Sequence, residues 1–111
     1  MQNLAAQIFL ARFFILLEKG KVIFDPRNNK TIDFLFEQGM TVDDVFLIIR
    51  KLTSNNFYEG PEKDRNGSPG DVMKFLYNYK GIRIYIKLKI IIDNINDIGA
   101  IMSFHKEGMY D

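Results

Sequence analysis

Three side chains in the second half of this chain have the types that acid–base chemistry at a phosphate requires. Tyr85 and Lys87 lie two residues apart within residues 82–92, and His105 follows in the sequence SFHKE. Histidine transfers protons near neutral pH, tyrosine stacks or donates a hydrogen bond, and lysine neutralises charge that develops on phosphorus. These groups suffice for metal-independent cleavage of RNA, because the 2′-hydroxyl beside each phosphate can serve as the nucleophile.

Residues 82–92 read IRIYIKLKIII, and their alternation predicts a strand. Isoleucine or leucine at positions 82, 84, 86, 88 and 90 alternates with Arg83, Tyr85, Lys87 and Lys89. A period of two puts each set on its own face of a sheet. One face is therefore expected to pack in the core, and the other face is cationic.

The cationic face extends beyond this strand, although the formal net charge of the whole chain is only +1. Residues 72–92 contain Lys74, Lys80, Arg83, Lys87 and Lys89 and no carboxylate. We predict that Lys74, Arg83 and Lys89 bind the RNA backbone. The alternative interpretation is a solvated face whose lysines resist aggregation.

Length and composition predict one globular domain. With 111 residues, 47% of them hydrophobic, residues 1–111 are expected to enclose a single core. The absence of cysteine excludes disulfides and thiolate metal sites and fits a reducing cytoplasm. His105 is the only histidine, so no metal or other cofactor is expected. The apolar run at residues 5–17 is too short and too interrupted to span a bilayer, so no membrane partner is predicted.

Residues 5–17 instead predict a buried helix that ends at Lys19 and Gly20. Its buried stripe is expected to consist of Leu4, Ile8, Ala11 and Ile15, widened by Phe9, Phe13, Leu16 and Leu17. Residues 21–24 are expected to form a short strand.

Two further helices are predicted before the strands. Residues 31–38 form the first, with Asn28 or Asn29 as its N-cap and Gly39 after its last turn. Thr41 caps the second, in which Val45, Ile48, Ile49 and Leu52 are expected to face the core. Ser54 is expected to cap one more turn that reaches residue 58.

Residues 60–71 read GPEKDRNGSPGD and predict an exposed loop, because glycine, proline and charged residues dominate it. Glu62, Asp64, Asn66 and Gly67 imitate the start of a calcium-binding loop, but Met73 stands where the bidentate glutamate is needed. No metal site is therefore predicted there. A flexible loop beside a basic sheet could close over a long substrate.

The remaining residues predict an antiparallel meander. Residues 72–78 form a strand, residues 79–81 turn the chain into the strand at 82–92, and residues 100–104 form the last strand. Helices followed by a meander indicate an α+β domain, in which the N-terminal helices pack on one face of an antiparallel sheet and leave the other face open.

Several phrases resemble a known family. LTSNNFYEGP at residues 52–61, YIKLKI at 85–90 and SFHKE at 103–107 are similar in order and spacing to motifs of the motility quorum-sensing regulator (MqsR) family of bacterial toxins, over about residues 20–107. The resemblance implies a RelE-like fold and a metal-independent endoribonuclease, an mRNA interferase of a type II toxin-antitoxin system. It also implies a cognate antitoxin as partner, encoded by an adjacent gene and expected to contain a helix-turn-helix.

The family motifs also imply which residues form the site. The tyrosine and lysine of the family's VYLKI fall on Tyr85 and Lys87, and the terminal lysine of SFKE falls on His105. The glutamine of WQDVY falls near Lys74, and the lysine of FYK falls on Glu59, where the charge is reversed. Glu59 is expected either to act as a base or to hold a lysine.

Two alternatives to a free-RNA nuclease remain open from the sequence. The first is a non-catalytic module whose basic sheet face binds RNA or an acidic protein. The second is a RelE-like toxin that cleaves mRNA only on the ribosome.

Overall fold

The computed structural model describes residues 3–65, 67, 69–92 and 95–108 and has an α+β fold. In chain order its elements are α1 (Leu4–Glu18), β1 (Val22–Phe24), α2 (Asn29–Gln38), α3 (Val42–Ile49), a 3-10 turn (Ser54–Asn56), β2 (Phe57–Lys63), β3 (Asp71–Tyr79), β4 (Ile82–Ile91) and β5 (Ile98–Lys106). The predicted order, helices first and strands afterwards, is confirmed. In the described part of the chain, no helix is long and apolar enough to cross a membrane.

The five strands form one sheet in the order β1-β5-β4-β3-β2, with β4 at its centre. The predicted hairpin is confirmed, because β3 and β4 pair antiparallel from Tyr79 opposite Ile82 onward. The sheet is not wholly antiparallel as expected, because β1 pairs parallel with β5. The helical segments after β1 carry the chain to β2 at the opposite edge, and the meander from β2 to β5 then brings it back beside β1 in the parallel direction, which a tight hairpin cannot do.

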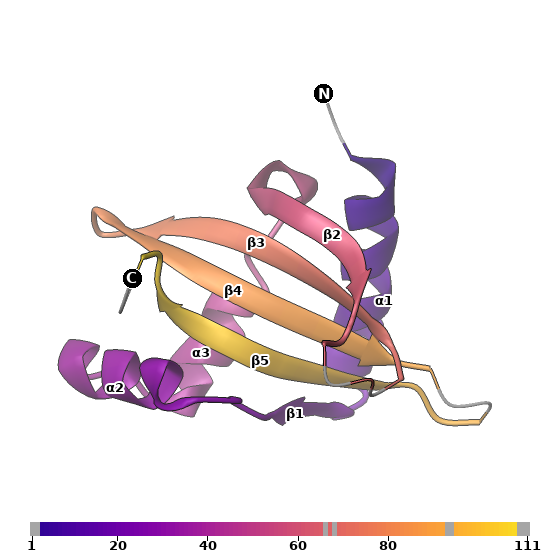
Figure 1. Cartoon of the computed structure of the whole chain (residues 1–111), viewed down its shortest axis with the longest axis horizontal. Coiled ribbons are helices and arrows are strands. Elements are labelled where there is room, and N and C mark those ends of the chain that lie inside the picture. Colours follow the sequence, from indigo (N-terminus) through magenta and orange to yellow (C-terminus); the bar gives the residue numbers. More distant parts are fainter. Residues whose placement is uncertain (1–2, 66, 68, 93–94, 109–111) are drawn as a thin grey trace.

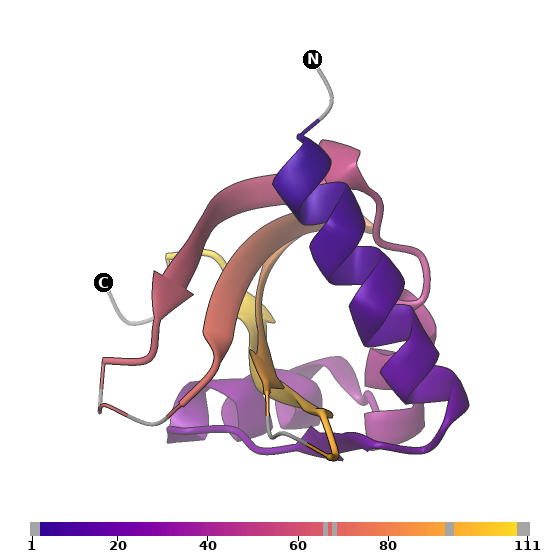
Figure 2. The same cartoon turned by 90° about the vertical axis from the view of Figure 1, so that its right-hand side faces the viewer.

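Helices α1 and α3 lie on one side of the sheet and leave the other side open, as predicted, while α2 lies beside the β5 edge. Figure 1 looks onto the open side, with α1 and α3 behind the strands, and Figure 2 shows α1 running along one side of the sheet. We call the side away from α1 and α3 the open face. Beside β5, α2 is held by a hydrogen bond from the Phe104 backbone N–H to the Thr31 hydroxyl, 3.0 Å long, and by Phe34 against the Phe104 ring.

Strand β4 confirms the predicted alternation. Ile84, Ile86 and Leu88 are fully buried against the helices, whereas Tyr85 and Lys87 are half-buried on the open face. Each buried aliphatic side chain stabilises the fold by about 1.5–3 kcal/mol, so the apolar set fixes which face of β4 turns inward.

The predicted buried stripe of α1 is partly wrong: Phe9, Phe13, Leu16 and Leu17 are buried as predicted, but the residues expected at its centre are not. Leu4, Ile8 and Ile15 are 68%, 54% and 54% exposed, while the neighbouring stripe is buried. The buried side chains of α1 are Ala6, Phe9, Leu10, Phe13, Leu16 and Leu17. The buried stripe is centred on Phe9 and Phe13, because aromatic rings bury more area than the aliphatic side chains of Leu4, Ile8 and Ile15 would. The Phe13 ring also needs Gly99, since a Cβ there would lie 2.9 Å from it.

The capping predictions for α2 and α3 are confirmed. The Asn28 side chain accepts the Lys30 backbone N–H, and Gly39 ends α2 in the left-handed conformation. Thr41 and Asp44 form a reciprocal capping box at the start of α3, where Val45, Ile48 and Ile49 are buried. These local signals fix where the chain turns toward the sheet.

The prediction of a loop over residues 60–71 is wrong in its first part, because β2 runs to Lys63 and pairs with β3. The prediction that Ser54 caps the preceding turn is also wrong: Thr53 is the N-cap, and the turn ends at Asn56 rather than reaching residue 58. Gly60 and Pro61 are tolerated because an edge strand needs hydrogen bonds on one side only. At Gly60, with φ of 118°, a Cβ would lie 2.9 Å from the Val72 carbonyl oxygen, so the close pairing requires glycine. Asn66 and Ser68 lie outside the described residues.

Strand β5 is longer than predicted and contains a register shift. Ile101 pairs with Leu88, but Ser103 pairs with Lys87, so Met102 is an extra residue. Such a bulge exchanges the faces that odd and even residues occupy. Ile101 before it and Phe104 after it both enter the core, and His105 turns to the open face.

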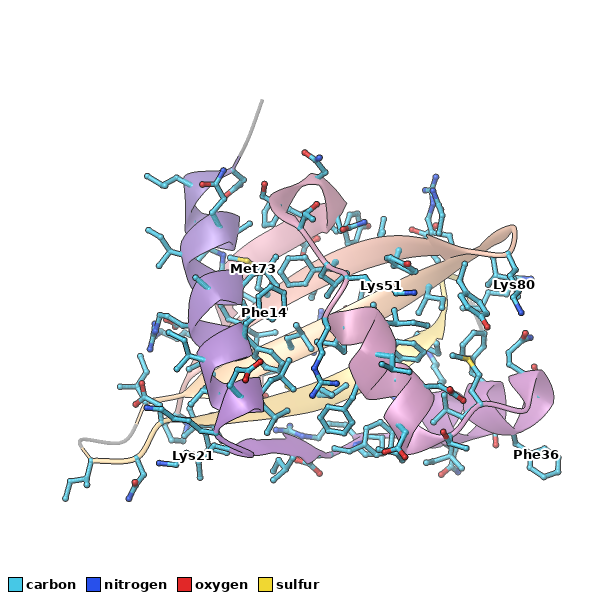
Figure 3. All side chains as sticks on the ribbon, turned by 180° about the vertical axis from the view of Figure 1, so that it is seen from behind. Phe14, Lys21, Phe36, Lys51, Met73 and Lys80 are labelled. Atoms are coloured by element: carbon cyan, nitrogen blue, oxygen red, sulfur yellow. The ribbon has the colours of Figure 1, made fainter. Side chains whose placement is uncertain are left out.

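We expect Phe104→Ala to lower the free energy of unfolding by about 3–5 kcal/mol, because it leaves a cavity between the sheet and α2. Phe36→Ala is the matched control, since Phe36 is 87% exposed and points away from the end of α2 (Figure 3), and it should change stability by less than about 0.5 kcal/mol. Urea denaturation of both variants measures the difference. Equal losses would contradict the described core.

Candidate active site

A cleft of about 700 Å³ opens on the open face and contains four of the residues singled out from the sequence. Tyr85, Lys87, His105 and Lys74 all line it. The other lining residues are Asn28, Lys30, Tyr58, Arg65, Ser103, Glu107 and Gly108. The cleft therefore brings together side chains from β2, β3, β4, β5 and the start of α2.

Two rows of paired residues form the floor of the cleft. Lys74, Lys87 and Ser103 lie opposite one another across β3, β4 and β5, and in the next row Tyr85 pairs with His105. Side chains of directly paired residues on one face are about 4.5–5.5 Å apart at Cβ. The Tyr85 and His105 ring centroids accordingly lie 5.3 Å apart.

His105 is almost fully buried in the cleft, with 8% of its surface exposed. Its Nδ1 lies 3.0 Å from the Lys106 backbone carbonyl oxygen. Because a carbonyl only accepts, Nδ1 carries the hydrogen when this contact is a hydrogen bond. The contact orients the ring as a proton-transfer group requires.

Lys74 is held by two carboxylates from β2. Its Nζ lies 3.0 Å from an oxygen of Glu59 and 3.0 Å from an oxygen of Glu62. Register shifts between Phe57 and Glu62 put both glutamates on the face that Lys74 occupies. Of the two roles expected for Glu59, the structure gives it that of holding a lysine.

These carboxylates set the protonation of the cluster. Burial lowers the pKa of Lys74, but the hydrogen bonds from Lys74 to Glu62 and Glu59 raise it, and the net result is a pKa above the ordinary value. The hydrogen bond from Lys74 holds the pKa of Glu62 below its ordinary value. Lys74 is therefore a fixed positive charge at the cleft floor rather than a proton donor.

The pKa values of Lys87 and Tyr85 are shifted in opposite directions. Burial and the positive charges of Lys74 and Arg65 lower the pKa of Lys87. Burial raises the pKa of the Tyr85 phenol, which therefore keeps its hydrogen and donates near neutral pH. The Tyr58 ring stands edge-on to Tyr85 at a centroid distance of 6.4 Å and supports its orientation.

Arg83 and Lys89, predicted to bind RNA, do not line the cleft. Arg83 lies on the open face with its side chain 57% exposed and contacts Glu107 at 3.5 Å. Lys89 is 2% exposed, and its Nζ donates to Asp64 at 2.6 Å. The prediction for Lys89 is wrong because the chain after β2 folds over this end of the open face.

Sequence reasoning missed Tyr58, Arg65, Ser103 and the start of α2. Ser103 had a usable signal, because it is two residues from His105 on one strand and therefore shares its face. Tyr58 and Arg65 belong to a segment interpreted as helical turn and loop, so no periodicity marked them. Lys30 reaches the cleft only because α2 packs against β5.

Within the described residues, no group of three or more histidine, aspartate or glutamate side chains is placed to hold a metal ion. The carboxylates compared with a calcium loop are instead paired with cations, Glu62 with Lys74 and Asp64 with Lys89. Asn66, the third residue of that comparison, lies outside the described residues.

Comparisons of this chain with protein-family models, curated proteins and solved structures give no match. The function therefore has to be argued from the chemistry of the cleft.

We expect the pKa of Lys87 to respond in opposite directions to two substitutions in this cluster. Lys74→Met removes a neighbouring positive charge and should raise the pKa of Lys87, whereas Glu62→Gln removes a negative charge and should lower it further. NMR titration of the Lys87 side chain measures both shifts. Movement in the same direction in the two variants would contradict the described charge arrangement.

Proposed function

We propose that this protein is a metal-independent endoribonuclease that cleaves mRNA through attack of the 2′-hydroxyl. The observation that supports this most is the convergence of Tyr85, Lys87 and His105 in one cleft, although His105 comes from a different strand. A proton-transfer group, a hydrogen-bond donor and a cation beside one another are the parts that this reaction needs.

In the proposed reaction, the 2′-oxygen attacks the adjacent phosphorus and loses its proton to water. A bond forms between the 2′-oxygen and phosphorus, and the bond from phosphorus to the 5′-oxygen breaks. His105 in its protonated form gives a proton to the departing 5′-oxygen. The products are a 2′,3′-cyclic phosphate and a 5′-hydroxyl, so no protein nucleophile, metal or oxidant is consumed.

The other two residues act on the charge that builds up on the phosphoryl oxygens. Lys87 lies in the row beside His105 and supplies a positive charge, and the protonated Tyr85 phenol donates a hydrogen bond. Preorganised donors of this kind typically contribute about 10²- to 10³-fold each to rate. Lys74 adds a positive charge at the cleft floor and transfers no proton.

The proposed biological role follows the family resemblance of the motifs. We infer a cytoplasmic toxin of a type II toxin-antitoxin system, with mRNA as substrate and a cognate antitoxin as partner. An antitoxin that covers the cationic cleft would stop the reaction, because the substrate phosphates would lose their binding surface.

Incubating the purified chain with naked RNA in EDTA tests the reaction. We expect cleavage products with 2′,3′-cyclic phosphate ends and no cleavage of a strand with a 2′-deoxy sugar at the cut site. Lys87→Ala should lower the rate about 10²-fold or more, while Lys51→Ala on the helix side should not change it. Tight binding without cleavage would favour the binding module, and cleavage only with ribosomes would favour the ribosome-dependent toxin.

The role of His105 has its own test. His105→Ala should lose about 10²- to 10⁴-fold in rate on normal RNA, and His105→Lys should recover part of it. A substrate with sulfur in place of the scissile 5′-oxygen needs little protonation, because thiolates leave with a conjugate pKa of about 8–9. His105→Ala should therefore cleave that substrate at nearly the wild-type rate. An equal loss on both substrates would show that His105 is not the general acid.

A further inference from the structure

A buried ion cluster lies on the open face beside the cleft and has no part in the reaction described above. The Asp64 carboxylate accepts from Lys89 Nζ at 2.6 Å and from Arg27 at 2.9 and 3.4 Å. The Asp64 and Lys89 side chains are only 3% and 2% exposed. We call Asp64, Lys89 and Arg27 the ion cluster.

The ion cluster joins three separate segments across the sheet. Asp64 follows β2 at one edge, Lys89 stands on the central strand, and Arg27 comes from the segment between β1 and α2 at the other edge. In Figure 1 the chain that follows β2 passes in front of the sheet toward β5. Beneath it, Val72, Ala100 and Met102 form a small apolar cluster that is fully covered on the open face.

Charged groups are a costly way to fasten a segment to a sheet. Replacing a buried ion pair by apolar side chains is often neutral or stabilising, so stability alone does not account for the cluster. Its hydrogen bonds are directional, however, and they fix the place and direction of the backbone at Asp64. The residue whose position depends most directly on that anchor is the next one, Arg65.

Arg65 lines the cleft together with Lys87. Among the described residues, neither side chain has a carboxylate within ion-pair distance, whereas Lys74, Arg27 and Arg83 all do. The charge of Arg65 also acts on Tyr85 and Lys87 of β4, since it opposes the rise in the pKa of Tyr85 and adds to the lowering of the pKa of Lys87. The cleft thus contains two cations whose counter-charge can come from a ligand.

We propose that Arg65 binds a backbone phosphate of single-stranded RNA that lies in the cleft, and that the ion cluster positions Arg65 for this contact. A guanidinium presents a planar fork that matches two phosphate oxygens, which suits a non-reacting phosphate. Lys89 then serves RNA binding from a buried position, without contacting RNA. The inference rests on the proposed function only in taking RNA as the ligand.

Equilibrium binding separates this proposal from the cleavage chemistry. The probe is a short fluorescent single-stranded RNA whose 2′-hydroxyls are all methylated, so that it cannot be cut, and binding is followed by anisotropy over a series of KCl concentrations. Arg65→Ala should weaken binding about tenfold and reduce the slope of log affinity against log salt by about 0.7, the value of one lost phosphate contact on a single strand. Arg50→Ala, an exposed arginine on the helix side, is the matched control and should bind as the wild type does.

A second variant tests the anchor itself. Asp64→Leu combined with Lys89→Met replaces the buried pair by apolar side chains, and position 89 pairs with Val72 and Ala100 of the small apolar cluster. The fold should therefore be retained, as circular dichroism would report. With Arg65 present but no longer positioned, this double variant should lose binding as Arg65→Ala does. Adding Arg65→Ala to the double variant should cause little further loss of affinity, because both changes remove the same contact between Arg65 and the phosphate.

Each result supports or overturns one part of the proposal. If Arg65→Ala keeps the wild-type affinity and salt slope, Arg65 is not a phosphate ligand and the proposal is overturned. If the folded double variant binds RNA as the wild type does, the ion cluster does not position Arg65, and the positioning role proposed for the cluster is overturned. If both weaken binding while the wild type cleaves no RNA in the parallel assay, the inference stands and the proposed nuclease activity fails.

Discussion

The rest of this structure depends on the central strand β4 having two different faces. Both of its edges are paired, so its side chains can point only toward the helices or away from them. Ile84, Ile86 and Leu88 take the helix side, and Tyr85 and Lys87 must therefore take the other. A slip of one residue would expose the core set and bury Tyr85 and Lys87, which fixes the register of β4 against β3 and β5. The packing of the core therefore determines that Tyr85 and Lys87 lie on the open face.

The neighbouring strands contribute to the site through their irregularities. The extra residue Met102 in β5 allows Ile101 and Phe104 to enter the same core and leaves His105 facing Tyr85. Without that bulge, a core-facing Ile101 would send His105 into the core as well, because residues four apart on a regular strand share a face. The register shifts of β2 similarly bring Glu59 and Glu62 to the same side as Lys74.

Ion pairs distinguish the cations of the open face, because some of them have carboxylate partners and others do not. Glu59 and Glu62 hold Lys74, and Asp64 holds Lys89, so each buried ammonium has the partner that burial requires. All three carboxylates come from one segment of the chain. Lys87 has no such partner among the described residues and lines the cleft, so its charge is available to an anion that binds there.

The sequence by itself determined the fold class, the caps of α2 and α3, the β3–β4 hairpin and the two faces of β4. These features depend on local spacing, since periodicity and capping act over a few residues. It also identified Tyr85, Lys87, Lys74 and His105 as residues of interest. Only the tertiary structure decided which stripe of α1 is buried, that residues 57–63 form an edge strand, and that Lys89 is covered. Those outcomes depend on which surfaces pack against one another across the sheet. The packing partners are far apart in the chain, and neither segment carries a periodic pattern that shows which partner it will meet.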